Sequence, residues 1–161
     1  MISLSGTVYV EPIVKIIRVQ AIPERAFEVF NTRTSRWWRS TFSISPTKTP
    51  IADIVIEPRV GGRLYERGVD GSECDWGCVL VWEPPTQLVL DWQIGAHSKF
   101  DPALHTEVDV RFEALASGIT EVTLEHRHLE RLGDAAADIG ARRSGGWEAL
   151  LKSYVTTLER Q

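Results

Sequence analysis

The chain has 161 residues, 43% of them apolar, including six Trp, five Phe and three Tyr. This size and apolar content predict one compact domain over residues 1–161, with its core at about residues 13–159. The formal charge of −4, with both signs interspersed, argues against a basic surface for nucleic acid. No apolar run approaches the roughly 20 residues that span a bilayer, and the start lacks a signal-peptide pattern. We therefore expect a cytoplasmic protein without membrane insertion.

The first third of the chain predicts a strand followed by two short helices. Residues 14–19 alternate apolar with polar side chains, and Pro23 suits the first turn of a helix over residues 24–30. A second short helical piece follows at residues 36–38. Because Trp37 and Trp38 are adjacent, a helix cannot point both inward, so one of them lies at a pocket entrance, at a contact surface or against the sheet rim.

The middle of the chain predicts a run of antiparallel strands, since apolar residues recur there with a period of two. The predicted strands cover residues 51–57, 63–67, 72–82, 87–94, 107–113 and 121–128. Turn signals separate them, such as Gly61-Gly62 and Pro84-Pro85. Cys74 and Cys78 share one strand about 13 Å apart, too far for a disulfide or a shared metal, and are read as small buried apolar residues.

The last third predicts a loop and a long helix. Residues 129–146 are Ala-rich and bounded by glycines, which favours a loop with at most one short helix and the character of a mobile lid. Residues 147–158 carry a wide apolar stripe at helical spacing. The whole order predicts an α+β fold in which a curved antiparallel sheet packs against one long helix.

A sheet curved around a single helix leaves a volume that the helix need not fill, so a pocket is expected between them. Alternation predicts that its walls are formed by Leu64, Glu66, Trp76, Cys78, Leu80, Leu90, Trp92, Ile94, Val108, Val110, Phe112, Leu124, His126 and His128. The facing helix contributes Trp147, Leu151 and Tyr154. Each apolar member also fits an ordinary packing role.

The polar members of this wall are the more informative ones. A carboxylate at Glu66 would need a partner or a proton in the interior, which suits a general acid, a general base or a ligand anchor. A shift of strand register would instead leave Glu66 in solvent beside Arg63 or Arg67. His126 and His128 have the spacing of two metal ligands, but no third ligand is identifiable, so no metal and no cofactor is predicted.

The sequence lacks the sharper catalytic signatures, such as a nucleophile elbow, a phosphate loop, a dinucleotide fingerprint or a zinc-binding His-Glu-x-x-His helix. The best catalytic candidates are therefore Glu66 and His126, as groups for proton transfer.

Several short motifs, in this order along the chain, resemble one known family. They are residues 57–67 with Gly61-Gly62-Arg63, then Trp76-Gly77, Trp82-Glu83-Pro84-Pro85 and Gly145-Gly146-Trp147. The set resembles the bacterial single-domain Hsp90-activator-homologue (AHSA1-like) branch of the START-like, or SRPBCC, superfamily. That resemblance implies a helix-grip fold with seven antiparallel strands around a long C-terminal helix. It further implies that Gly145-Gly146 lets the last helix start close to the sheet.

Three functions remain open at this level. The first is binding of a small apolar or aromatic molecule between the sheet and the last helix, with Trp76 and Trp92 stacking on it. The second is a cyclase, hydrolase or isomerase that uses Glu66 or His126. The third is a protein-interaction or chaperone-associated module, and a homodimer is compatible with all three.

Overall fold

The computed structural model describes residues 9–38 and 43–160, and its centre is a seven-stranded antiparallel sheet. Neighbouring strands follow the order β1-β7-β6-β5-β4-β3-β2, so β1 and β2 form the two edges. The strands are β1 (Ile13–Val19), β2 (Ile51–Ile56), β3 (Arg63–Gly68), β4 (Glu73–Glu83), β5 (Gln87–Trp92), β6 (Thr106–Ala116) and β7 (Ile119–Arg127). All six strands expected in the middle of the chain, and the first strand, are confirmed.

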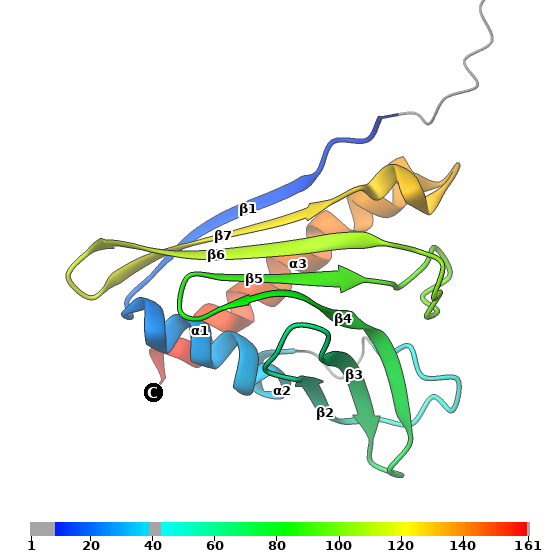
Figure 1. Ribbon diagram of the computed structural model, residues 1–161, viewed down its shortest axis with the longest axis horizontal. Coiled ribbons are helices and arrows are strands. Elements are labelled where there is room, and N and C mark those ends of the chain that lie inside the picture. Colours follow the sequence, from blue (N-terminus) through cyan, green and yellow to red (C-terminus); the bar gives the residue numbers. More distant parts are fainter. Residues whose placement is uncertain (1–8, 39–42, 161) are drawn as a thin grey trace, which may run out of the picture.

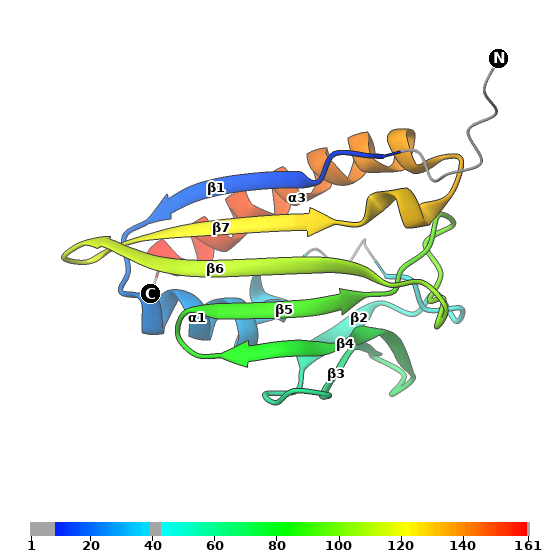
Figure 2. The same cartoon turned by 45° about the horizontal axis from the view of Figure 1, so that its top comes forward.

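One long helix covers one face of this sheet. The helices are α1 (Pro23–Thr32), α2 (Thr34–Trp37), the short 3-10 helix η2 (Leu129–Leu132) and α3 (Ala136–Glu159). Figures 1 and 2 show α3 crossing the sheet, with α1 near its C-terminal end. The helix-grip architecture expected from the sequence is confirmed. Within the part of the chain that the structure describes, no helix is long and apolar enough to cross a membrane.

The core at the α1 end of the molecule is filled by aromatic rings. Phe30 contacts Phe112 of β6 and Tyr154 of α3, with ring centroids 5.9 and 5.5 Å apart and near-perpendicular planes. The Tyr154 hydroxyl donates a 2.7 Å hydrogen bond to the carbonyl of Ala26. Burial raises the pKa of this phenol, so it stays protonated and keeps α3 attached to α1.

The predicted inward positions of β4 are wrong beyond Trp76. The register of β3 against β4 shifts between Leu64 and Tyr65, and the register of β4 against β5 shifts between Val79 and Val81. Each shift changes which side chains face inward, because the side-chain period of a strand is two. Val79 is therefore buried where alternation pointed Cys78 inward. Leu80, also expected inside, is 38% exposed.

The two cysteines are free, as expected, but half-buried instead of buried. Desolvation raises the pKa of both thiols, and nearby carboxylates, Glu66 for Cys74 and Asp91 for Cys78, add to the effect. Both thiols therefore stay protonated near neutral pH, which makes them poor nucleophiles.

The prediction of a loop over residues 129–146 is also wrong, because α3 begins at Ala136 and runs through Gly145-Gly146 without a break. A glycine costs a helix roughly 1 kcal/mol, which burial of its apolar face can offset. The first turns of α3 bury Ala136 and Ile139. Gly140 is buried too, and a Cβ there would meet the Leu129 side chain of η2 at 3.7 Å. The segment is a packed part of the long helix.

Candidate functional site

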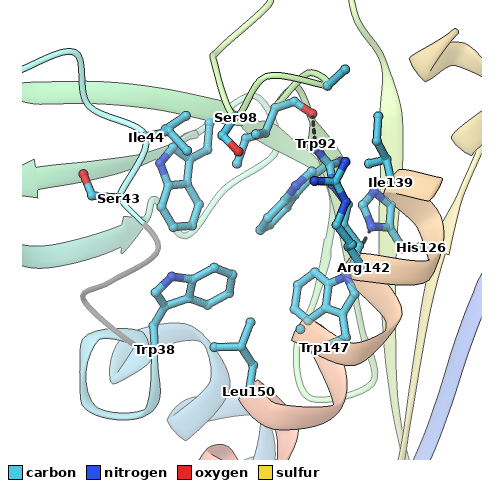
Figure 3. A pocket seen from close by; sticks show the side chains of 15 residues that line it. Trp38, Ser43, Ile44, Trp92, Ser98, His126, Ile139, Arg142, Trp147 and Leu150 are labelled. Carbon is cyan, nitrogen blue, oxygen red and sulfur yellow. Dashed lines mark hydrogen bonds between the residues drawn. The ribbon is translucent and has the colours of Figure 1, made fainter. Parts of the chain in front are cut away.

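A pocket of about 360 Å³ lies between the N-terminal half of α3, the end of β5 and the segment just before β2. Its volume is within the roughly 300–1,000 Å³ typical of small-molecule sites. The lining residues are Trp38, Ser43, Ile44, Trp76, Trp92, Ile94, Ala96, Ser98, His126, Ile139, Arg142, Arg143, Gly146, Trp147 and Leu150. Figure 3 shows Trp38, just after α2, and Trp147, on α3, projecting toward this space, with Leu150 between them.

Four tryptophans form the floor of the pocket. Trp38 follows α2 and contacts the indoles of Trp76, Trp92 and Trp147, with centroids 5.0, 5.9 and 5.8 Å apart. Trp92 also contacts Trp76 at 5.6 Å and Trp147 at 5.3 Å. Deeper in the molecule these rings border a void of only about 10 Å³, which is at most the space of one water. The indoles therefore fill the interior between the sheet and α3, and the open space is confined to the pocket at one end of the molecule.

The Trp37-Trp38 pair divides its two side chains between core and pocket. Trp37 is 1% exposed, and its indole nitrogen donates to the carbonyl of Val29 at 3.2 Å. Trp38 directly follows α2, has an extended backbone and lines the pocket. The sequence left open a pocket entrance, a contact surface or the sheet rim for one tryptophan of this pair. That tryptophan is Trp38, and it lies at the pocket.

Glu66 is 1% exposed, on the inner face of β3, so the solvent alternative is wrong. Its carboxylate accepts hydrogen bonds from the Ser43 hydroxyl at 2.6 Å, the Ile44 backbone N–H at 2.7 Å and the Trp76 indole N–H at 2.9 Å. These donors satisfy the buried acceptor, as its burial requires. All three donor residues line the pocket, so Glu66 fixes that wall from behind.

His126 lines the pocket and is fully buried, opposite Val108 in the β6–β7 register. The Thr106 hydroxyl donates to the carbonyl of Trp92 at 2.6 Å, so its oxygen can accept from His126 Nε2 at 3.0 Å. His126 Nδ1 accepts from the Trp147 indole N–H at 3.2 Å. This network selects the neutral ring protonated on Nε2.

Burial and the positive charge of Arg143 lower the pKa of His126 to about 3. The ring is therefore uncharged across the neutral range, and the Nδ1 lone pair is occupied by Trp147. A role as a base would require that indole to move first.

Arg143 joins α3 to the chain that follows β5. One guanidinium nitrogen, Nη2, donates to the carbonyls of Ile94 and Gly95, each at 3.0 Å. Burial, and to a smaller degree the neighbouring Arg142, lowers the pKa of Arg143 to about 10, so it stays charged at neutral pH. In Figure 3, Arg142 and Ile139 lie along the same α3 wall.

The predicted site residues fall into three groups. Trp76, Trp92, His126 and Trp147 line the pocket, and Glu66 supports its wall. Others are packed in the core away from its main volume: Leu64, Val110, Phe112, Leu124, Leu151 and Tyr154. Cys78 and Leu80 do not face the pocket, for the register reason given above.

His128 was expected beside His126 on one strand face, and this is wrong. β7 ends at Arg127, and His128 takes a left-handed backbone with φ of 65°. Its side chain is 38% exposed, 3.9 Å from the Glu107 carboxylate. The two imidazoles therefore do not converge, and among residues 9–38 and 43–160 no group of three or more His, Cys, Asp or Glu side chains could hold a metal ion.

Sequence reasoning missed the α3 wall and the segment at Ser43-Ile44. The glycine-rich sequence around Ile139, Arg142, Arg143 and Gly146 predicts a loop, whereas these residues lie on α3. Their spacing of three and four residues, from Ile139 to Arg142 and Arg143 and on to Gly146, was the available signal of a shared helix face. Ser43 and Ile44 lie outside any strand or helix, so no periodicity could have placed them.

Comparison with known proteins extends this geometry to a family. The sequence model described as Activator of Hsp90 ATPase homolog 1-like protein matches residues 20–159. No curated protein matches. Among solved structures, an anthrahydroquino-γ-pyrone synthase, Txn09, complexed with SUM, is 38% identical with a TM-score of 0.58, covering 81% of this chain and 84% of that one. The self-sacrificing resistance protein CalC from Micromonospora echinospora is 27% identical with a TM-score of 0.70, covering 93% and 95%.

A more distant structure, the Aha1 dimer from Colwellia psychrerythraea, is 19% identical with a TM-score of 0.63 and covers 93% of this chain and 97% of its own. At that identity it supports the fold alone. The family match spans nearly all of the sheet and the whole of α3, and it agrees with the motifs of the sequence. The chain belongs to the Activator of Hsp90 ATPase homolog 1-like protein family.

Proposed function

We propose that this protein binds one small, largely aromatic molecule in the pocket between β5, α3 and residues 43–44. The observation that carries the proposal is the convergence of Trp38, Trp76, Trp92 and Trp147 on a pocket of about 360 Å³. Indole faces and edges favour planar aromatic partners, and concave apolar sites with few polar groups are typical of ligand binding. The Ser98 hydroxyl is one of the polar groups available to orient a ligand there.

Tryptophan fluorescence tests this proposal directly. Titration with planar bicyclic and tricyclic ketones should quench the indole emission at a ratio of one ligand per chain. Trp38→Leu should weaken binding, because Trp38 is the half-buried indole of the pocket. Trp82→Leu is the matched control, since Trp82 packs on Phe27, 5.2 Å away between centroids, and does not line the pocket.

Two results would oppose the proposal. The first is the absence of saturable quenching with every compound of the series. The second is equal weakening by Trp38→Leu and Trp82→Leu, because that would indicate a general effect on the fold. Native mass spectrometry of protein from its own host would show independently whether a molecule of this kind accompanies the chain.

A second candidate function is closure of a γ-pyrone ring on an aromatic substrate. It is favoured by the 38% identity to the anthrahydroquino-γ-pyrone synthase over 81% of this chain. Closure of such a ring by addition of a hydroxyl oxygen to an alkynyl ketone forms the C–O bond at the expense of one π bond of the alkyne, and the hydroxyl proton is lost while a carbon gains one. Glu66 and His126 are the candidates for these transfers, although the present hydrogen bonds occupy both.

The test of this second function uses an aryl alkynyl ketone that carries a free hydroxyl on the aryl ring. Product is followed by liquid chromatography and mass spectrometry against the rate without protein. Acceleration that falls at least tenfold in Glu66→Gln or His126→Gln would support the assigned groups. No acceleration by the wild-type protein would leave binding as the function. The expected cytoplasmic location and a homodimer both stay predictions.

A further inference from the structure

Two consecutive arginines of α3 line the pocket without any acidic partner among the described residues. Neither Arg142 nor Arg143 lies within 4.0 Å of a carboxylate of the described residues, whereas eight other arginines do. This is unusual in a chain with a formal charge of −4, where acidic side chains outnumber basic ones. Arg142 is exposed and Arg143 is partly buried.

Arg143 is held in place but is incompletely paired. Nη2 uses its donors on the carbonyls of Ile94 and Gly95. Nη1 is buried and has no hydrogen-bond partner within residues 9–38 and 43–160. Burying a cation that has an unpaired N–H donor and no counter-ion costs free energy. A ligand of the pocket that supplies an acceptor would offset this cost.

The other described residues of the pocket wall supply no compensating charge. Arg142 and Arg143 are the only residues carrying a full charge among those described as lining it, because His126 is neutral. Glu66 lies behind the wall, and its carboxylate already accepts three hydrogen bonds from Ser43, Ile44 and Trp76. Two positive charges therefore face the pocket and one negative charge lies behind its wall among the described residues, and an anion would lower the energy of both guanidiniums.

We propose that the ligand of this pocket is an aromatic molecule with an anionic oxygen, a carboxylate or an ionised hydroxyl, which Arg142 and Arg143 bind while the indoles contact its rings. This inference rests on the proposed binding function and adds the charge class of the ligand. Arginine suits such an oxygen because its planar donors can hold it in a fixed orientation. Arg143 is oriented beforehand by its bonds to Ile94 and Gly95, just after β5, and Arg142 can adjust to the ligand.

The experiment compares two probes of nearly equal shape, anthraquinone-2-carboxylate and the neutral anthraquinone-2-carboxamide, by isothermal titration calorimetry at pH 7. Wild-type protein should bind the carboxylate at least tenfold more tightly, as expected for a charge-assisted hydrogen bond. In Arg142→Gln and Arg143→Gln this preference should shrink toward one, because affinity for the carboxylate falls more than affinity for the carboxamide. Arg160→Gln, at the C-terminal cap of α3 outside the pocket, is the control for loss of one positive charge.

The outcomes separate the two proposals. If both probes bind the wild-type protein equally, the charge class is wrong and the binding function stands. If the preference exists but persists in both pocket variants, or falls equally in Arg160→Gln, the assignment to Arg142 and Arg143 is overturned. If neither probe binds at any concentration tested, both proposals fail for this ligand class. Because Arg142 is exposed and makes no hydrogen bond to other described residues, Arg142→Gln tests the inference even if Arg143→Gln folds poorly.

Discussion

Glu66 shows how one buried side chain can hold a pocket wall in place. It ties Ser43 and Ile44, which belong to no strand or helix, to β3 and to Trp76. Glu66→Ala would leave the buried Trp76 donor and the half-buried Ser43 and Ile44 donors without an acceptor, so we expect the free energy of unfolding to fall by about 3 kcal/mol. Glu66→Gln keeps one acceptor oxygen and should cost about 1 kcal/mol. Urea denaturation measures both changes.

The control for this prediction is Glu113→Ala on β6, because that side chain is exposed and takes part in no hydrogen bond or ion pair among the described residues. Its effect should stay within about 0.5 kcal/mol, as for most surface substitutions. A loss in Glu66→Ala as small as that of Glu113→Ala would contradict the role assigned to the carboxylate.

His126 makes a prediction about pH. The folded ring has a pKa of about 3, whereas an unfolded histidine takes up its proton near pH 6.5. Between these values the unfolded state binds more protons, so stability falls as the pH falls, by up to about 1.4 kcal/mol per unit from this group. His126→Gln should remove that part of the slope. Nitrogen NMR of the wild-type ring should show an uncharged imidazole protonated on Nε2 at pH 5, and an imidazolium there would refute the argument.

At the level of secondary structure, the course of α3 through Gly145 predicts that replacing this glycine stabilises the protein. Gly145 is exposed within the helix, and a Cβ there would meet nothing within 4 Å. Gly145→Ala should therefore raise the free energy of unfolding by about 0.5–1 kcal/mol, since alanine is the better helix former. Gly77→Ala should strongly destabilise, because its Cβ would collide with the carbonyl oxygen of Asp91. Thermal unfolding compares the two, and a destabilised Gly145→Ala would contradict a continuous helix.

Periodicity in the sequence predicts most of the fold, and it fails where strand pairing is irregular or where glycines lie inside a helix. The order of strands and helices followed from periodicity, because a curved sheet and a helix bury apolar faces with periods of two and 3.6. Alternation placed Glu66, Trp92 and His126 inside correctly. It failed at Leu80 because irregular pairing in β4 leaves no trace in the local pattern. The prediction of a loop at Gly145-Gly146 failed because burial of Ile139 and Trp147 outweighs the low helix propensity of glycine.

The whole molecule is densely packed at one end and open at the other. At the α1 end, Phe30, Phe112 and Tyr154 fill the space between sheet and helix. The pocket lies at the opposite end, where α3 begins and the chain leaves β5, and Figure 1 shows these two ends of α3 far apart. A ligand in this pocket should therefore order the open end without changing the packed one.

Hydrogen exchange followed by mass spectrometry tests this asymmetry with anthraquinone-2-carboxylate at saturation. Peptides covering residues 94–104 and the first half of α3, residues 136–147, should exchange more slowly, since they carry Ile94, Ser98 and Arg143. Peptides from the turn between β6 and β7 and from residues 151–159 should exchange at unchanged rates, because none of these residues lines the pocket. Slower exchange over the whole chain would reflect global stabilisation by the ligand. Adding enough denaturant to the liganded sample to match the stability of the free protein removes this global contribution. Protection confined to the α1 end under those conditions would show that the ligand binds elsewhere.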